Sequence, residues 1–234
     1  MKHFFLSLLV IGGIATLTSC EKETEKVDKP TTTLNYKLTA DTKVAQFGVN
    51  DGRDVGTEEF ESFKWTGGSV GVSDIKFEAK ADDNNKLEFK SSVDQRFDLY
   101  DAWASIGSVE VPQQVAFKSV EFKIGFAPVN DEPSLLLTGT FEHEGQTVPI
   151  SLVVDRKFEL KFEKKTPTVF DGNMDELEVQ ALMAVAQLSQ GFTEEMFFNA
   201  MRTNGEVVIS TSSNPELYAM IWQRIESILK IEIK

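Results

Sequence analysis

Cysteine and histidine are nearly absent from this chain. Its 234 residues include one cysteine, Cys20, and two histidines, of which only His143 lies outside residues 1–19. A disulfide joins two cysteines, and a structural zinc site needs four ligands, commonly cysteine and histidine. A disulfide within the chain, a zinc site of this type and bis-histidine haem ligation are therefore excluded, and we expect no cofactor.

The chain also lacks an apolar run long enough to cross a membrane as a helix. Such a helix needs about 20 predominantly apolar residues, and the run at residues 4–16 is shorter. This run follows Lys2 and precedes small residues, which is the order of a secretory signal peptide. We therefore expect residues 1–19 to be a signal peptide that is removed on export.

The most specific motif in the sequence ends this signal peptide. Leu17, Thr18, Ser19 and Cys20 resemble the bacterial lipobox, in which a cysteine receives diacylglycerol before the signal is cleaved. The resemblance implies that Cys20 becomes the first residue of the mature protein and holds it on a membrane through lipid. Two or more acyl chains form a durable anchor, because each buried methylene contributes about 0.8 kcal/mol. An ordinary signal peptide with a chance cysteine is the alternative.

A charged segment, residues 20–33, follows the lipobox. It has few large apolar residues and cannot bury enough surface to order itself, so we predict a flexible tether. Its acidic residues resemble the surface-export signal of lipoproteins from the Bacteroidetes group. That resemblance implies an outer-membrane protein that faces the cell surface, and periplasmic exposure is the alternative.

Basic residues are in the minority. The chain has 24 Lys and Arg against 37 Asp and Glu, which gives a formal net charge of −13. Binding to nucleic-acid phosphates relies on clustered Lys and Arg, so nucleic acid is not an expected partner. Eighteen phenylalanines and a hydrophobic content of 41% supply a core, so the domain is predicted to be globular.

Apolar and polar residues alternate over much of residues 34–162. The clearest run is 120–126, and a period of two is typical of strands with one buried face. A change of phase between Val72 and Ile75 predicts a β-bulge. Turn signals about every ten residues favour a sandwich or a barrel.

The pattern changes in the last part of the chain. Residues 179–188 suit either a strand or a helix. Thr193 is a predicted N-cap of a helix that runs through Met201. Asn214, followed by Pro215 at the first helical position, predicts the start of a second helix.

Together these patterns predict a mainly antiparallel β-sandwich in residues 34–172. Residues 173–234 are expected to form a small C-terminal α-β segment with two helices, packed on the sandwich. The order of four short segments resembles uncharacterised Bacteroidetes surface lipoproteins: 73–78, 97–99, 106–112 and 120–124. That resemblance implies a prealbumin-like or immunoglobulin-like β-sandwich and carries no functional residues over.

One cluster combines carboxylates with aromatic rings in a predicted loop. It consists of Asp98, Tyr100, Asp101 and Trp103, which we consider candidates for ligand binding. Paired carboxylates at a defined separation hydrolyse glycosidic bonds, so a tethered glycan hydrolase that uses these residues is one hypothesis. A loop that merely buries its aromatic side chains is the alternative.

Asp171, Asn173 and Asp175 place oxygen ligands at alternate positions, as a calcium loop does. The segment lacks the central glycine and the final acidic residue of an EF-hand loop. A solvated turn is therefore the alternative interpretation, both here and for the similar residues 50–54.

These features favour binding over catalysis. We expect a membrane-anchored, non-enzymatic binding or assembly module of the outer membrane or cell surface. Its partner would be an envelope protein or an extracellular glycan. A carboxylate-dependent glycan hydrolase and a carrier of a small apolar ligand are the two alternatives.

Overall fold

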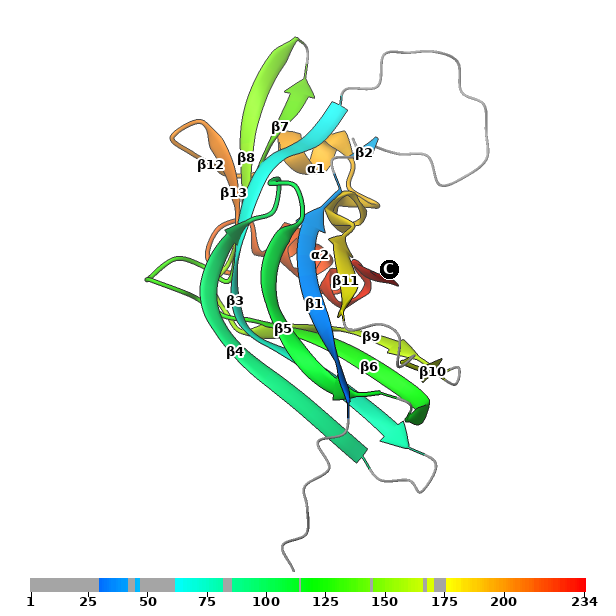
Figure 1. Ribbon diagram of the computed structural model, residues 1–234. Coiled ribbons are helices and arrows are strands. Elements are labelled where there is room, and N and C mark those ends of the chain that lie inside the picture. The colour runs from blue at the N-terminus through cyan, green and yellow to red at the C-terminus, as the bar shows by residue number, and fades with distance from the viewer. Residues whose placement is uncertain are drawn as a thin grey trace, which may run out of the picture.

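The computed structural model describes residues 30–41, 45–46, 62–81, 86–113, 115–143, 145–165, 168–170 and 176–234. The fold is mainly β, with two sheets that face each other as in a sandwich and two short α-helices (Figure 1). This confirms the predicted fold class.

The smaller sheet has four strands in the order β14, β11, β1, β5. Their bounds are β1 (Thr31–Ala40), β5 (Ala104–Pro112), β11 (Glu176–Met183) and β14 (Leu229–Ile233). Strand β1 is parallel to β11 and antiparallel to β5. Since β1 begins at Thr31, the predicted tether of residues 20–33 extends three residues too far. Three consecutive threonines show no hydrophobic alternation, yet their β-branched side chains suit a strand.

The larger sheet is built on the long strand β3 (Ser62–Ala81). Its path runs β10, β6, β3, β7, β8, β13, β12, with β2 and β4 also paired to β3 and β9 to β6. The remaining bounds are β2 (Ala45–Gln46), β4 (Lys86–Asp98), β6 (Ala116–Phe126), β7 (Leu135–His143), β8 (Gln146–Val154), β9 (Phe158–Lys164), β10 (Thr168–Val169), β12 (Arg202–Thr203) and β13 (Glu206–Ile209). Both ladders that involve this part of β3 shift register between Val72 and Asp74, so the predicted bulge is confirmed.

The C-terminal part of the chain contributes strands to both sheets. Strands β11 and β14 belong to the smaller sheet and β12 and β13 to the larger one. We expected residues 173–234 to form an α-β segment packed on the sandwich, and within it β13 extends the larger sheet through a parallel pairing with β8. Such pairings join residues far apart in sequence, which a local pattern does not indicate.

The described residues also contain four short helices. They are the 3₁₀ helices η1 (Val185–Ser189) and η2 (Ile225–Ser227) and the α-helices α1 (Glu194–Phe198) and α2 (Pro215–Trp222). Thr193 caps α1 as predicted, since its side chain accepts a hydrogen bond from the Met196 N–H at 3.4 Å. The ambiguous residues 179–188 are a strand up to Met183 and then η1.

Phenylalanines fill one end of the core between the sheets. The Phe77 ring lies 5.3 to 6.1 Å from four other rings, those of Phe89, Phe117, Phe122 and Phe170. From the opposite sheet, Tyr36 on β1 is 6.3 Å from Phe122 and donates a hydrogen bond to the Lys76 carbonyl at 3.3 Å. The two sheets are therefore joined by aromatic contacts at this end.

The outer face of β4, β3, β6 and β9 is charged. Like charges lie opposite one another across the strands, in one row of lysines and one of glutamates: Lys90, Lys76, Lys123 and Lys161, then Glu88, Glu78, Glu121 and Glu163. Opposed like charges are unfavourable, but ion pairs between the rows offset this, as where Lys123 Nζ lies 2.7 Å from Glu78. Burial acts to raise the pKa of Glu78, and hydrogen bonds from Lys123 and Lys86 outweigh it and lower the pKa.

Candidate functional site

The inner face of β4 is only partly covered. Leu87, Phe89 and Val93 are half-buried and pack against the core. Ser91 on the same face is also half-buried, while Glu88, Lys90 and Ser92 on the other face are exposed. Strand β4 hydrogen-bonds to β3, and β5 hydrogen-bonds to β1. The two strands run side by side as edges of different sheets (Figure 1), and the half-buried side chains of β4 lie at this edge.

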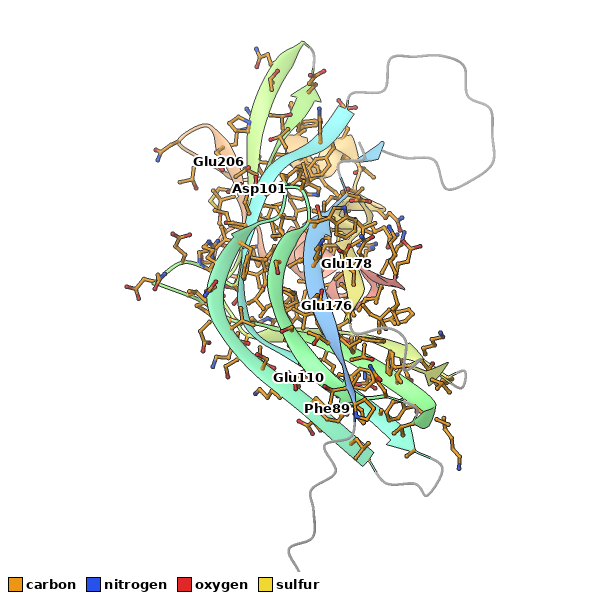
Figure 2. The ribbon with its side chains drawn as sticks, viewed as in Figure 1. Phe89, Asp101, Glu110, Glu176, Glu178 and Glu206 are labelled. Atoms are coloured by element: carbon orange, nitrogen blue, oxygen red, sulfur yellow. The ribbon has the colours of Figure 1, made fainter. Side chains whose placement is uncertain are left out.

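A recess of about 700 Å³ opens at this place, lined by Thr31, Leu87, Phe89, Glu110, Pro112 and Val115. Four of these residues are apolar, and Glu110 is the one charged side chain among them. The floor continues into the core, because the Phe89 ring is 6.1 Å from that of Phe77. Figure 2 shows Phe89 and Glu110 near the start of β1, at the end of the molecule opposite Asp101.

A glycine lets β5 approach the core next to this recess. Gly107 has a φ of +129°, and an added Cβ would lie 3.2 Å from Ile75 Cδ1 and 3.7 Å from Val93 Cγ2. The register of β5 on β1 shifts at the same level, between Tyr36 and Lys37. Strand β5 is therefore close to the core at Gly107, and the recess opens further along it, at Glu110.

Gln113 fixes the rim of the recess. Its backbone N–H donates to the Pro30 carbonyl at 2.9 Å, and its side-chain Nε2 donates to the Thr31 carbonyl at 2.9 Å. Gln113 is itself buried. These hydrogen bonds hold the end of β5 to the start of β1. Thr31, the first residue of β1, therefore lies at the edge of the recess.

The chemistry of the recess suits an amphipathic ligand. Leu87, Phe89, Pro112 and Val115 offer apolar surface, and the Glu110 carboxylate is exposed at the rim. Binding sites commonly pair an apolar lining with a few polar groups that fix orientation. A ligand with an apolar chain and a cationic or hydrogen-bond-donating head would match both parts.

The predicted cluster at residues 98–103 forms the connection between β4 and β5. The Tyr100 N–H donates to Asp98 Oδ1 at 2.8 Å, and Trp103 adopts a left-handed φ of +51°. Asp98 and Asp101 are exposed, and Tyr100 and Trp103 are half-buried. The structure thus brings the four candidates to one loop, and that loop lies away from the recess (Figure 2).

Sequence reasoning missed Asp41 as a neighbour of this loop. Burial raises the pKa of Tyr100 to about 12, with smaller contributions from the charges of Asp41 and Asp98. Asp41 also accepts a hydrogen bond from the Ala186 N–H at 3.3 Å. No sequence pattern joins Asp41 to Tyr100, because they meet only when β1 pairs beside β5.

The remaining candidates lie outside the described residues. Cys20, the lipobox, Asp171, Asn173, Asp175 and the segment 50–54 are among them. In the part of the chain that is described, no three histidine, cysteine or acidic side chains gather as metal ligands would. His143 is the last residue of β7, where its backbone pairs with that of Gln146 at the start of β8.

No protein-family model, no curated protein and no solved structure matches the chain. Within the described ranges, no helix has the length and apolar character needed to span a bilayer. Fold and recess together define a β-sandwich with an apolar opening at one edge. The lipobox and the resemblance to Bacteroidetes lipoproteins stay predictions from the sequence.

Proposed function

We propose that this protein is a membrane-anchored, non-enzymatic binding module of the cell envelope that takes an amphipathic ligand with an apolar chain. The observation that carries the proposal is the half-buried inner face of β4, which leaves Leu87 and Phe89 open to the recess. A binding role agrees with the leading expectation from the sequence. The apolar lining favours an apolar ligand over a glycan.

The position of the recess supports a ligand drawn from a membrane. Residues 21–30 separate the proposed lipid site at Cys20 from Thr31, which lines the recess. The path from Cys20 to Thr31 is eleven residue steps, which span at most about 40 Å when fully extended. The anchor therefore keeps the recess within that distance of the membrane surface, and an acyl-chain ligand has a short path from one to the other.

The expected affinity follows from the surface that a chain would bury. Each methylene removed from water contributes about 0.8 kcal/mol. Burial of about ten methylenes would give about 8 kcal/mol, which corresponds to a dissociation constant near 1 μM. Immobilising a flexible chain costs part of this gain, so we expect micromolar to tens of micromolar binding.

The anchor is tested with the variant Cys20→Ala. The parent chain, expressed in a bacterium grown in labelled palmitate, is expected to take up label and to remain with the membrane fraction. The variant is expected to lose the label, because the only thiol in the chain is gone. Equal labelling of the two proteins would exclude lipidation at Cys20.

The recess is tested by titration calorimetry of the chain from Glu21 onward. The probes are dodecyltrimethylammonium and dodecanoate, each below its micelle concentration. We expect the cationic probe to bind more tightly, and Phe89→Asp to weaken its binding at least tenfold, because a carboxylate in the recess must be desolvated.

Two further variants make this titration specific. Glu110→Gln is expected to reduce the preference for the cationic probe, since Glu110 is the one charged lining residue. Val169→Asp is the matched control, because Val169 is exposed and lies outside the recess. If Phe89→Asp bound the probe as tightly as the parent and Val169→Asp, the proposed site would be wrong.

A further inference from the structure

A second hollow, the groove between α1 and α2, lies apart from the recess. Its volume is about 520 Å³, and its apolar lining consists of Met196, Ala200, Met201, Pro215, Leu217 and Met220. None of these residues lines the recess. In Figure 1, α1 lies toward the end of the molecule opposite the start of β1. The groove is therefore a separate feature of the fold.

Exposed apolar side chains gather at the groove. Met196 is 37% and Met201 is 62% exposed, and Phe198, which lies between them in sequence but does not line the groove, is 57% exposed. In the described part of the chain, Val169 is the one other large hydrophobic residue with such exposure. Scattered apolar residues on a surface are ordinary, but a cluster beside a hollow is typical of an interaction site.

Asn214 holds the two walls of the groove together. Its Oδ1 accepts a hydrogen bond from the Met201 N–H at 2.8 Å, and its Nδ2 donates to the Met201 and Val208 carbonyls, both at 2.9 Å. Helix α2 begins at Pro215 as predicted, but Asn214 has a left-handed φ of +52° and its side chain makes no cap hydrogen bond. Its side chain instead fixes the segment that carries the exposed Met201.

The rim of the groove is acidic. Glu195 and Glu216 belong to its lining, which contains no lysine or arginine. Complementary charge across an interface speeds encounter and disfavours wrong partners, so this rim selects for a cationic ligand. Methionine side chains are flexible and polarizable and adapt to different apolar surfaces. An apolar groove is a surface into which an amphipathic helix can lay its apolar face.

We propose that the groove docks a basic amphipathic segment of a partner protein. Apolar side chains of that segment would pack on Met196, Met201 and Met220, and its lysines or arginines would pair with Glu195 and Glu216. This site is independent of ligand binding in the recess. A protein held on a membrane near Thr31 would then present α1 away from its anchored end.

The docking site is tested with a dye-labelled amphipathic peptide of about fourteen leucines and lysines. Fluorescence anisotropy on the parent chain is expected to show micromolar binding. The binding should weaken with added salt, because salt screens the attraction between the peptide lysines and the glutamates of the rim. The double variant Met196→Gln with Met201→Gln is expected to bind at least tenfold more weakly. Both side chains are exposed, so the thermal midpoint of this variant should match that of the parent.

Three controls make the outcome decisive. Val169→Gln, at an exposed apolar residue outside the groove, should bind the peptide as the parent does. A peptide with glutamates in place of the lysines should not bind, because the rim is acidic. Dodecyltrimethylammonium should not displace the basic peptide, because the recess and the groove are separate sites. Equal affinity of the parent and the double methionine variant would overturn the proposal. So would a dimer, seen by sedimentation, that the methionine variant loses, because a second copy would then occupy the groove.

Discussion

Replacement of Phe77 by alanine is expected to lower the free energy of unfolding by about 3–5 kcal/mol. Phe77 is fully buried, and its ring contacts those of Phe89, Phe117, Phe122 and Phe170. Alanine would leave a cavity that the surrounding rings, which are held by β4, β6 and the residue after β10, cannot fill together. Urea denaturation followed by tryptophan fluorescence measures the loss.

Phe89→Ala is the matched control for this variant. The Phe89 ring is half-buried and joins the cluster through Phe77, so its loss is expected to cost about half as much, roughly 2 kcal/mol. The two substitutions remove the same atoms and differ in burial. Equal costs would contradict the partly covered inner face of β4, on which the recess depends.

Gly71→Ala is expected to destabilise the protein by about 3 kcal/mol or more, because overpacking against a rigid backbone is not relieved by side-chain movement. A Cβ at this position would lie 2.2 Å from the Ala127 carbonyl oxygen and 2.9 Å from Val129 Cγ2. The backbone there is fixed on both sides, since the Gly71 N–H donates to Ser134 and the Gly71 carbonyl accepts from Ala127, each at 3.0 Å. Thermal unfolding by circular dichroism measures the effect.

Gly145→Ala separates this clash from the strain of the backbone. Gly145 has a φ of +72° and nothing within 4 Å of an added Cβ. Alanine there meets no steric clash, and the left-handed backbone alone lowers the free energy of unfolding by about 1 kcal/mol. Gly71→Ala should therefore lower the thermal midpoint much more. The reverse order would show that Gly71 does not lie against the Ala127 carbonyl.

Local signals in the sequence predicted the local structure well. The alternating run 120–126 lies in β6, and the change of phase at residues 72–75 is a bulge in β3. Thr193 caps α1, because a threonine side chain reaches the N–H three residues on. Helix α1 nevertheless ends at Phe198, before the predicted Met201. Each success depends on residues within one strand or one turn.

Long-range pairing was beyond the reach of these signals. Strand β1 pairs in parallel with β11, and only that contact makes the last part of the chain integral to the smaller sheet. Hydrophobic alternation shows that a strand has a buried face and not which strand lies beside it. The sequence therefore indicated an α-β segment packed on the sandwich and not the strands with which that segment pairs.

The recess could not be predicted for a related reason. Leu87 and Phe89 alternate with polar residues as any core-facing pair does. They are half-buried because β4 and β5 are edges of different sheets. The loop cluster of Asp98, Tyr100 and Asp101 was predicted from sequence proximity, and Asp41 was not, since it lies far away along the chain.

The most direct measurement of recess binding is photocrosslinking with a diazirine-labelled dodecylamine, followed by peptide mapping with mass spectrometry. The label is expected on peptides that contain Leu87 and Phe89 or Pro112 and Val115, which line the recess. Unlabelled dodecyltrimethylammonium should compete it away, and Phe89→Asp should remove it. Label confined to the methionines of the groove, or spread evenly over the surface, would contradict binding in the recess.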